Sequence, residues 1–154
     1  MTKPLVALLA ALTLTLAMSD ASADQTIVFL RHGEKPALGL GQLDCQGLNR
    51  ALALPQVLQA KFGTPTAIYA PDPGSTAKDK GVEYNYVRPL ATIEPTAIRL
   101  GMPVNTSFGL RQIQQLEQDL LKPANSSATI YVAWEHNLAQ QAAQHLLAAV
   151  GGNT

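Results

Sequence analysis

The sequence predicts an α/β protein of three layers, α/β/α, in which a mainly parallel sheet lies between helices. The order of segments along the chain predicts this class. Short apolar runs suited to buried strands alternate along the chain with longer stretches of helical periodicity. The single cysteine excludes an intramolecular disulfide, so packing must hold the fold together.

Four segments have the apolar, β-branched or aromatic character of strands, namely 26–30, 67–70, 104–107 and 129–134. The first helix is expected to follow Asp44, whose carboxylate suits the N-cap position. Pro55 predicts a kink or a restart in this helix because proline lacks the backbone N–H. Its expected apolar stripe consists of Leu48, Leu52, Leu58 and Phe62.

Three further helices complete the pattern. The second begins at Pro89, a residue suited to the first helical turn, and stops at Gly101. The third covers 110–121, with an inner face made of Ile113, Leu116 and Leu120. The fourth is expected to be capped by Asn137 and to run to Gly151.

Residues 1–23 have the pattern of a secretory signal peptide. Lys3 supplies a basic start, 5–18 form an uncharged apolar run, and Ala21-Ser22-Ala23 offers small residues for cleavage. A retained membrane anchor is the alternative, but the run is shorter than the about 20 residues needed to span a bilayer. We expect export, cleavage near Ala23, no stable membrane insertion afterwards, and a periplasmic or secreted domain over 24–154.

The chain has no net formal charge, so it lacks the overall positive field that draws proteins to nucleic acid. Any anion specificity must therefore be local. Cys45 has no basic or histidine neighbour to lower its pKa, and we expect it to be a buried or half-buried bystander.

The stretch 71–87 contains turn formers and charges without periodicity, which predicts an exposed loop insertion. Loops of this length are often binding loops or lids, and a disordered spacer is the alternative. Tyr84 and Tyr86, just before Arg88, favour a recognition role.

Four side chains able to bind an anion follow strands or open a helix. Arg31 and His32 follow the first strand, Arg88 heads the second helix, and His136 follows the last strand. Because the carboxyl ends of parallel strands share one edge of a sheet, these residues are expected to converge there. Arginine forks hydrogen bonds to phosphate, and neutral imidazole is a nucleophile. Taken singly, each residue is more often structural or solvated.

The ordered set resembles the histidine phosphatase superfamily, whose fold is called phosphoglycerate mutase-like. The resemblance covers most of 24–154 and rests on five segments: Arg31-His32-Gly33-Glu34, residues 44–51, residues 67–70, Arg88 with Thr92 and Thr96, and 131–136 ending at His136. It implies that His32 takes the phosphoryl group as phosphohistidine. It also implies that Arg31, Arg88 and His136 bind the phosphate oxygens, without a metal or another cofactor.

The chain departs from that family pattern at the general acid. Many relatives carry a glutamate soon after the third strand, but 104–109 contain no carboxylate. The candidates are Glu83, which can swing in from the loop, Glu34, and Glu135, which can serve only if the chain turns there, since neighbours on a strand point to opposite faces. If no acid exists, the chemistry favours acyl phosphates, anhydrides or phosphohistidine.

Two other departures are the insertion before Arg88 and a C-terminus that is short for the family. The leading interpretation is an exported phosphatase that acts on phosphorylated small molecules or envelope components. The alternative is a non-catalytic phosphate-binding or scaffold protein of the same fold, and a mutase is a third interpretation.

Overall fold

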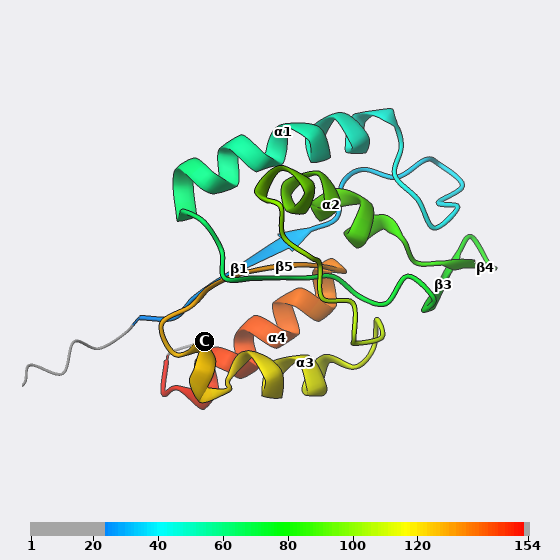
Figure 1. The fold of residues 1–154 in the computed structure, drawn as a ribbon. Helices are drawn as coiled ribbons and strands as arrows, with labels where there is room; N and C mark the ends of the chain where they lie inside the picture. Colours follow the sequence, from blue (N-terminus) through cyan, green and yellow to red (C-terminus); the bar gives the residue numbers. More distant parts are fainter. Residues whose placement is uncertain (1–23, 153–154) are drawn as a thin grey trace, which may run out of the picture.

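The computed structural model describes residues 24–152, so the expected signal peptide at 1–23 lies outside the described residues. Three parallel strands form the main sheet in the order β1-β5-β2. They are β1 (Thr26–Arg31), β2 (Ala67–Tyr69) and β5 (Thr129–Trp134). Two helices cover each face in Figure 1: α1 (Cys45–Phe62) and α2 (Arg88–Leu100) on one, α3 (Ile113–Leu120) and α4 (His136–Ala149) on the other. The predicted mixed α/β class with a parallel sheet is confirmed.

The central strand β5 supplies both halves of the core because its side chains alternate between the two faces. Ile130, Val132 and Trp134 pack on the α3 and α4 side, whereas Tyr131 and Ala133 pack on the α1 and α2 side. Arg31 pairs with Trp134 at the carboxyl ends of β1 and β5. The residues that follow these two strands therefore emerge side by side.

The expected strand at 104–107 is wrong. Only Asn105 forms a parallel bridge, with Tyr69. Asn105 exchanges backbone hydrogen bonds with Ile68 and Ala70, but its side-chain oxygen then accepts from the Ser107 amide at 2.9 Å. This local turn diverts the backbone from the sheet after one residue.

The stretch 71–87 is also more ordered than the loop that its composition predicts. It contains an antiparallel hairpin made of β3 (Thr76–Asp79) and β4 (Val82–Asn85). Lys80 and Gly81 both have positive φ, 51° and 87°, as the twist of a two-residue hairpin turn requires. The hairpin lies beyond the carboxyl ends of the parallel strands in Figure 1.

Helix α1 begins after Asp44, whose side chain caps the Gly47 amide as predicted. The predicted apolar stripe is largely wrong, since Leu48, Leu52 and Phe62 are exposed. The buried face instead comprises Gly47, Ala51, Pro55 and Leu58. Small residues on this face allow a close approach to the neighbouring backbone. The predicted restart does not occur, and one helix continues through Pro55. Cys45 is exposed, contrary to expectation.

The remaining helices follow the sequence pattern more closely. Helix α2 has its proline in the first turn, and Gly101 ends it in a left-handed conformation. Helix α3 starts three residues later than predicted and buries its expected inner face. Glu135, not Asn137, caps α4, because its carboxylate accepts from the Leu138 amide at 3.0 Å. Among residues 24–152, no helix combines the length and apolarity needed to cross a membrane.

Candidate active site

A cleft of about 800 Å³ lies at the carboxyl ends of the parallel strands, between the hairpin and the start of α4. All four residues that the sequence singled out line it, namely Arg31, His32, Arg88 and His136. Arg31 ends β1, His32 follows it, and Arg88 and His136 are the first residues of α2 and α4. The structure thus brings together four side chains that are distant along the chain.

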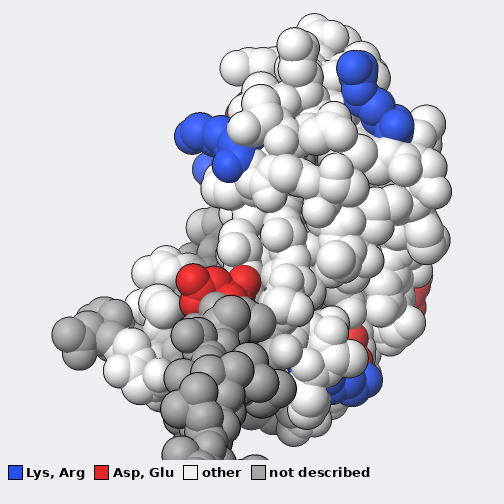
Figure 2. All heavy atoms as spheres, turned by 60° about the vertical axis from the view of Figure 1, so that its left-hand side comes forward, with Lys and Arg blue, Asp and Glu red and all other residues white. Residues whose placement is uncertain are grey.

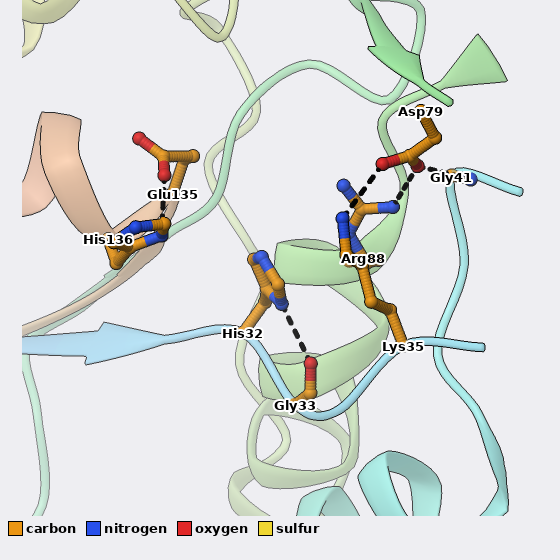
Figure 3. A network of polar contacts seen from close by, with 8 residues as sticks. All are labelled: His32, Gly33, Lys35, Gly41, Asp79, Arg88, Glu135 and His136. Atoms are coloured by element: carbon orange, nitrogen blue, oxygen red, sulfur yellow. Dashed lines mark hydrogen bonds and ion pairs between the residues drawn. The ribbon is translucent and has the colours of Figure 1, made fainter. Parts of the chain in front are cut away.

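His32 is 5% exposed, and its Nδ1 lies 2.7 Å from the carbonyl oxygen of Gly33 (Figure 3). A carbonyl only accepts hydrogen bonds, so Nδ1 carries the proton and Nε2 of the neutral ring keeps its lone pair. Burial lowers the pKa of His32, and the Gly33 hydrogen bond opposes this effect. The nearby charges of Arg88, Arg31 and Lys35 lower the pKa further. The ring is therefore held neutral with one nitrogen available.

The loop after His32 is fixed from two sides. The Gly33 amide donates to the Thr92 hydroxyl at 2.9 Å, and that hydroxyl donates to the Arg88 carbonyl at 2.8 Å. On the other side, a Cβ on Gly33 would lie 2.9 Å from the Cα of Gly47 in α1. The φ of Gly33 is not positive, so its backbone conformation alone does not call for a glycine. Glycine is required here because a Cβ would collide with α1. The nucleophile candidate sits on a rigid turn.

Arg88 is buried and pairs with a carboxylate that the sequence analysis missed. Its Nη1 donates to Asp79 at 2.5 Å, and its guanidinium lies 4.4 Å above the Tyr86 ring. Asp79, at the end of β3, also accepts from Lys35 at 3.0 Å and from the Gly41 amide at 3.1 Å (Figure 3). Burial alone would raise the pKa of Asp79, but these hydrogen bonds outweigh burial and hold the pKa well below its usual range. Asp79 therefore stays ionised and holds the Arg88 guanidinium in place through an ion pair.

One nitrogen of Arg88 has no partner. Its Nε is buried and makes no hydrogen bond within the described residues. A buried donor on a charged group that stays unpaired destabilises a protein by about 1–3 kcal/mol or more. Arg88 as a residue lines the cleft, so its guanidinium is suited to bind an anion there.

The three candidate general acids differ in position. Glu34 does not line the cleft and pairs with Arg50 at 3.3 Å. Glu83 lines the cleft from β4 and is exposed. Glu135 lines it as well, because the chain turns at this residue into α4, which satisfies the condition set by the sequence. Its Oε1 lies 2.6 Å from Nδ1 of His136.

Three more cations line the cleft without having been singled out by the sequence, Lys35 after β1, Lys78 on β3 and Arg111 just before α3. The sequence signal for Lys78 was the alternation of side chains typical of a strand over residues 76–79. The charged turn that follows obscured this pattern. Within residues 24–152, no group of three or more His, Cys, Asp or Glu side chains is arranged to hold a metal ion. The cleft is thus defined by arginine, lysine and histidine, with carboxylates that pair with them.

No protein-family model matches the chain, and no curated protein matches it. The structure itself defines a mixed α/β protein with a cationic cleft at the carboxyl edge of a parallel sheet.

Proposed function

We propose that the protein is a phosphatase that hydrolyses phosphate esters or anhydrides through a phosphohistidine intermediate on His32. The observation that carries the proposal is the hydrogen bond that leaves one nitrogen of the neutral His32 ring unprotonated. Its Nδ1–H is tied to Gly33, which leaves Nε2 free in a cleft that three arginines line. The proposal includes membership of the histidine phosphatase superfamily and its phosphoglycerate mutase-like fold.

The proposed reaction has two displacements. Nε2 of His32 attacks phosphorus while the bond from phosphorus to the leaving oxygen breaks, and that oxygen keeps the electron pair and takes a proton. Water then attacks the phosphohistidine, the N–P bond breaks, and inorganic phosphate leaves. The low pKa of His32 supports this role because the ring stays unprotonated near neutral pH.

The phosphate oxygens are assigned to Arg31, Arg88 and His136. Negative charge spreads over the equatorial oxygens during phosphoryl transfer, so fixed positive charge supplies most of the catalysis. Arg88 lines the cleft, and Asp79 holds its guanidinium in place. His136 lies in the same cleft with its Nδ1 2.6 Å from the Glu135 carboxylate, and its ring is assigned to the phosphate oxygens. This scheme uses no metal and no other cofactor.

For the proton donor we propose Glu135 ahead of Glu83, because Glu135 is half-buried in the cleft and adjoins His136. Comparison of leaving groups tests whether an acid is needed at all. With a working acid, an alkyl phosphate is turned over at a rate comparable to that of acetyl phosphate or a nitrophenyl ester. Without one, only the activated compounds react.

The proposed function is tested by trapping the intermediate. We expect the 24–154 chain to hydrolyse a chromogenic phosphate ester and, when quenched in base, to carry a phosphoryl group on His32 detectable by peptide mass spectrometry. His32→Ala should abolish both signals. Tight binding of phosphate without turnover would instead indicate the non-catalytic phosphate-binding or scaffold protein.

We also propose that the protein acts after export, on phosphorylated small molecules or envelope components. The sequence pattern of residues 1–23 supports export. N-terminal sequencing of the protein from a periplasmic or secreted fraction should begin near Asp24. An N-terminus at Met1 in that fraction would contradict cleavage.

A further inference from the structure

The cleft concentrates positive charge in a chain that has none overall. Half of the Lys and Arg residues within 24–152 line it, namely Arg31, Lys35, Lys78, Arg88 and Arg111. The acids that line it are fewer, Asp79, Glu83 and Glu135. By contrast, Figure 2, turned toward the left-hand side of Figure 1, shows Lys and Arg side chains as separate groups where the described surface is visible. The charge of the cleft is therefore local.

Three of the positively charged or imidazole groups in the cleft are already engaged. Asp79 binds Arg88 and Lys35, and Glu135 binds His136. Arg31 directly precedes His32 and is assigned to the phosphoryl group. Lys78 and Arg111 remain, and neither takes part in the ion pairs found within 24–152. Glu83 is paired in register with Lys78 across the hairpin without a salt bridge, so this part of the cleft keeps a net positive charge.

Lys78 and Arg111 come from two walls that are joined to each other. Lys78 lies on β3, and Arg111 lies in the segment that leads into α3. The Leu110 amide donates to the Ser75 hydroxyl at 3.0 Å, which ties the segment of Arg111 to the base of the hairpin. Figure 1 shows that segment and the hairpin on the same side of the sheet. Both side chains are exposed, so they form the rim of a cleft whose floor is buried His32 and Arg88.

The size of the cleft leaves room beyond one phosphoryl group. Its volume of about 800 Å³ lies in the range of about 300–1,000 Å³ that holds drug-sized ligands. The part of the ligand outside the phosphoryl group would meet the hairpin and the segment before α3. A leaving group that carries its own negative charge matches the cations there.

We infer that Lys78 and Arg111 form a second anion subsite, and that the substrate is a phosphate ester or anhydride whose leaving group bears a further anionic group. This inference rests on the proposed function, since it assigns the first subsite to the transferred phosphoryl group. The second subsite selects among substrates and takes no part in bond breaking.

Binding of non-hydrolysable ligands tests the subsite without turnover. Calorimetry at physiological salt would compare alkylphosphonates with alkylene bisphosphonates of the same chain length, from one to four carbons. We expect at least one bisphosphonate to bind about tenfold more tightly than its monophosphonate partner, since two cations contact the second group. The double variant Lys78→Gln/Arg111→Gln should lose this preference and keep its affinity for the monophosphonates within about twofold.

Two matched controls separate the subsite from general electrostatics. Lys80 lies two residues from Lys78 at the hairpin turn and does not line the cleft, and Arg99 lies at the end of α2. Lys80→Gln/Arg99→Gln removes the same charge and should keep the preference for bisphosphonates. The inference is overturned if wild type shows no preference at any chain length, or if the two double variants behave alike.

A comparison of hydrolysis rates distinguishes failure of this inference from failure of the proposed function. Wild type should show a higher kcat/KM for 4-carboxyphenyl phosphate than for phenyl phosphate, and Lys78→Gln/Arg111→Gln should bring the two values together. If no ester is hydrolysed while the bisphosphonate preference holds, the phosphatase proposal fails and the second subsite stands. If both esters are hydrolysed equally by wild type and the binding preference is absent, the subsite fails and the phosphatase proposal stands.

Discussion

Two hollows within residues 24–152 are of nearly equal size, and they differ in almost every other respect. The cleft at the carboxyl ends of the strands measures about 800 Å³, and a groove beside the start of β1 measures about 880 Å³. The groove is lined mainly by apolar side chains, among them Ile27, Phe29, Leu146, Leu147 and Val150. The cleft contains two buried charged groups and a buried histidine. Volume therefore does not locate the chemistry here, whereas buried polar groups do.

Strand β1 contributes to both hollows, so the difference arises from the direction of the sheet. Ile27 and Phe29 of this strand lie against the groove, and its last residue, Arg31, reaches the cleft. All three parallel strands point their carboxyl ends toward the cleft. Side chains that follow separate strands can meet only at that end.

Matched substitutions in the two hollows should give the largest contrast. His32→Ala removes the nucleophile and is expected to lower kcat for a nitrophenyl ester by at least about 10⁴-fold. Leu147→Gln, in the groove, should leave kcat/KM within about twofold. Steady-state kinetics checks both. Equal losses in the two variants would place the chemistry elsewhere.

The buried ion pair of the cleft should dominate stability on that side. Asp79→Ala leaves Arg88 buried without its partner and is expected to lower the free energy of unfolding by about 3–5 kcal/mol. Lys35→Ala breaks the second ion pair of Asp79, but the Lys35 side chain is 49% exposed, so the expected loss is about 1 kcal/mol or less. Urea denaturation measures both, and a smaller loss for Asp79→Ala than for Lys35→Ala would refute the assignment.

Substrates with different leaving groups distinguish the candidate general acids. Glu135→Gln keeps an acceptor for the helix cap but removes the proton, so kcat for an alkyl phosphate should fall about 10²-fold. The loss for a nitrophenyl ester should be much smaller, because that leaving group needs no proton. Glu34→Gln, outside the cleft, should change neither rate by more than about twofold. A purely structural role of Glu135 would slow both substrates equally.

The smallest effect concerns pH. Because the pKa of His32 is lowered from 6.5, the unfolded chain binds a proton that the folded chain does not as the pH falls below 6.5. Stability should therefore decrease on acidification, by at most about 1.4 kcal/mol per pH unit from this group. The slope of unfolding free energy between pH 7.5 and 5 should be shallower in His32→Asn. An identical slope would show that His32 titrates normally.

The sequence predicted the three strands of the main sheet and the four convergent residues, because these depend on local patterns, but it added a strand at 104–107 and missed the hairpin. Apolar runs marked β1 and β5, and the parallel arrangement then brought His32 and His136 to one edge. Asp79 was missed because its burial depends on a hairpin whose turn needs positive φ at Lys80 and Gly81. The composition of residues 71–87 suits a charged hairpin turn and a disordered spacer equally, so composition alone could not identify the hairpin.

The inner face of α1 was missed for a different reason. Periodicity favoured large apolar residues such as Leu48 and Leu52, yet both are exposed. The helix lies so close to the loop after His32 that only small residues fit on its inner face at that point. Such contacts depend on tertiary approach, which a hydropathy pattern does not record.

The contact between Gly33 and Gly47 has one more consequence. A single methyl group at either position would act as a wedge between α1 and the backbone that carries His32, because the nearest atoms are main-chain atoms that no rotamer change can move aside. The orientation of the His32 imidazole therefore depends on two glycines, Gly33 in the loop and Gly47 in the helix.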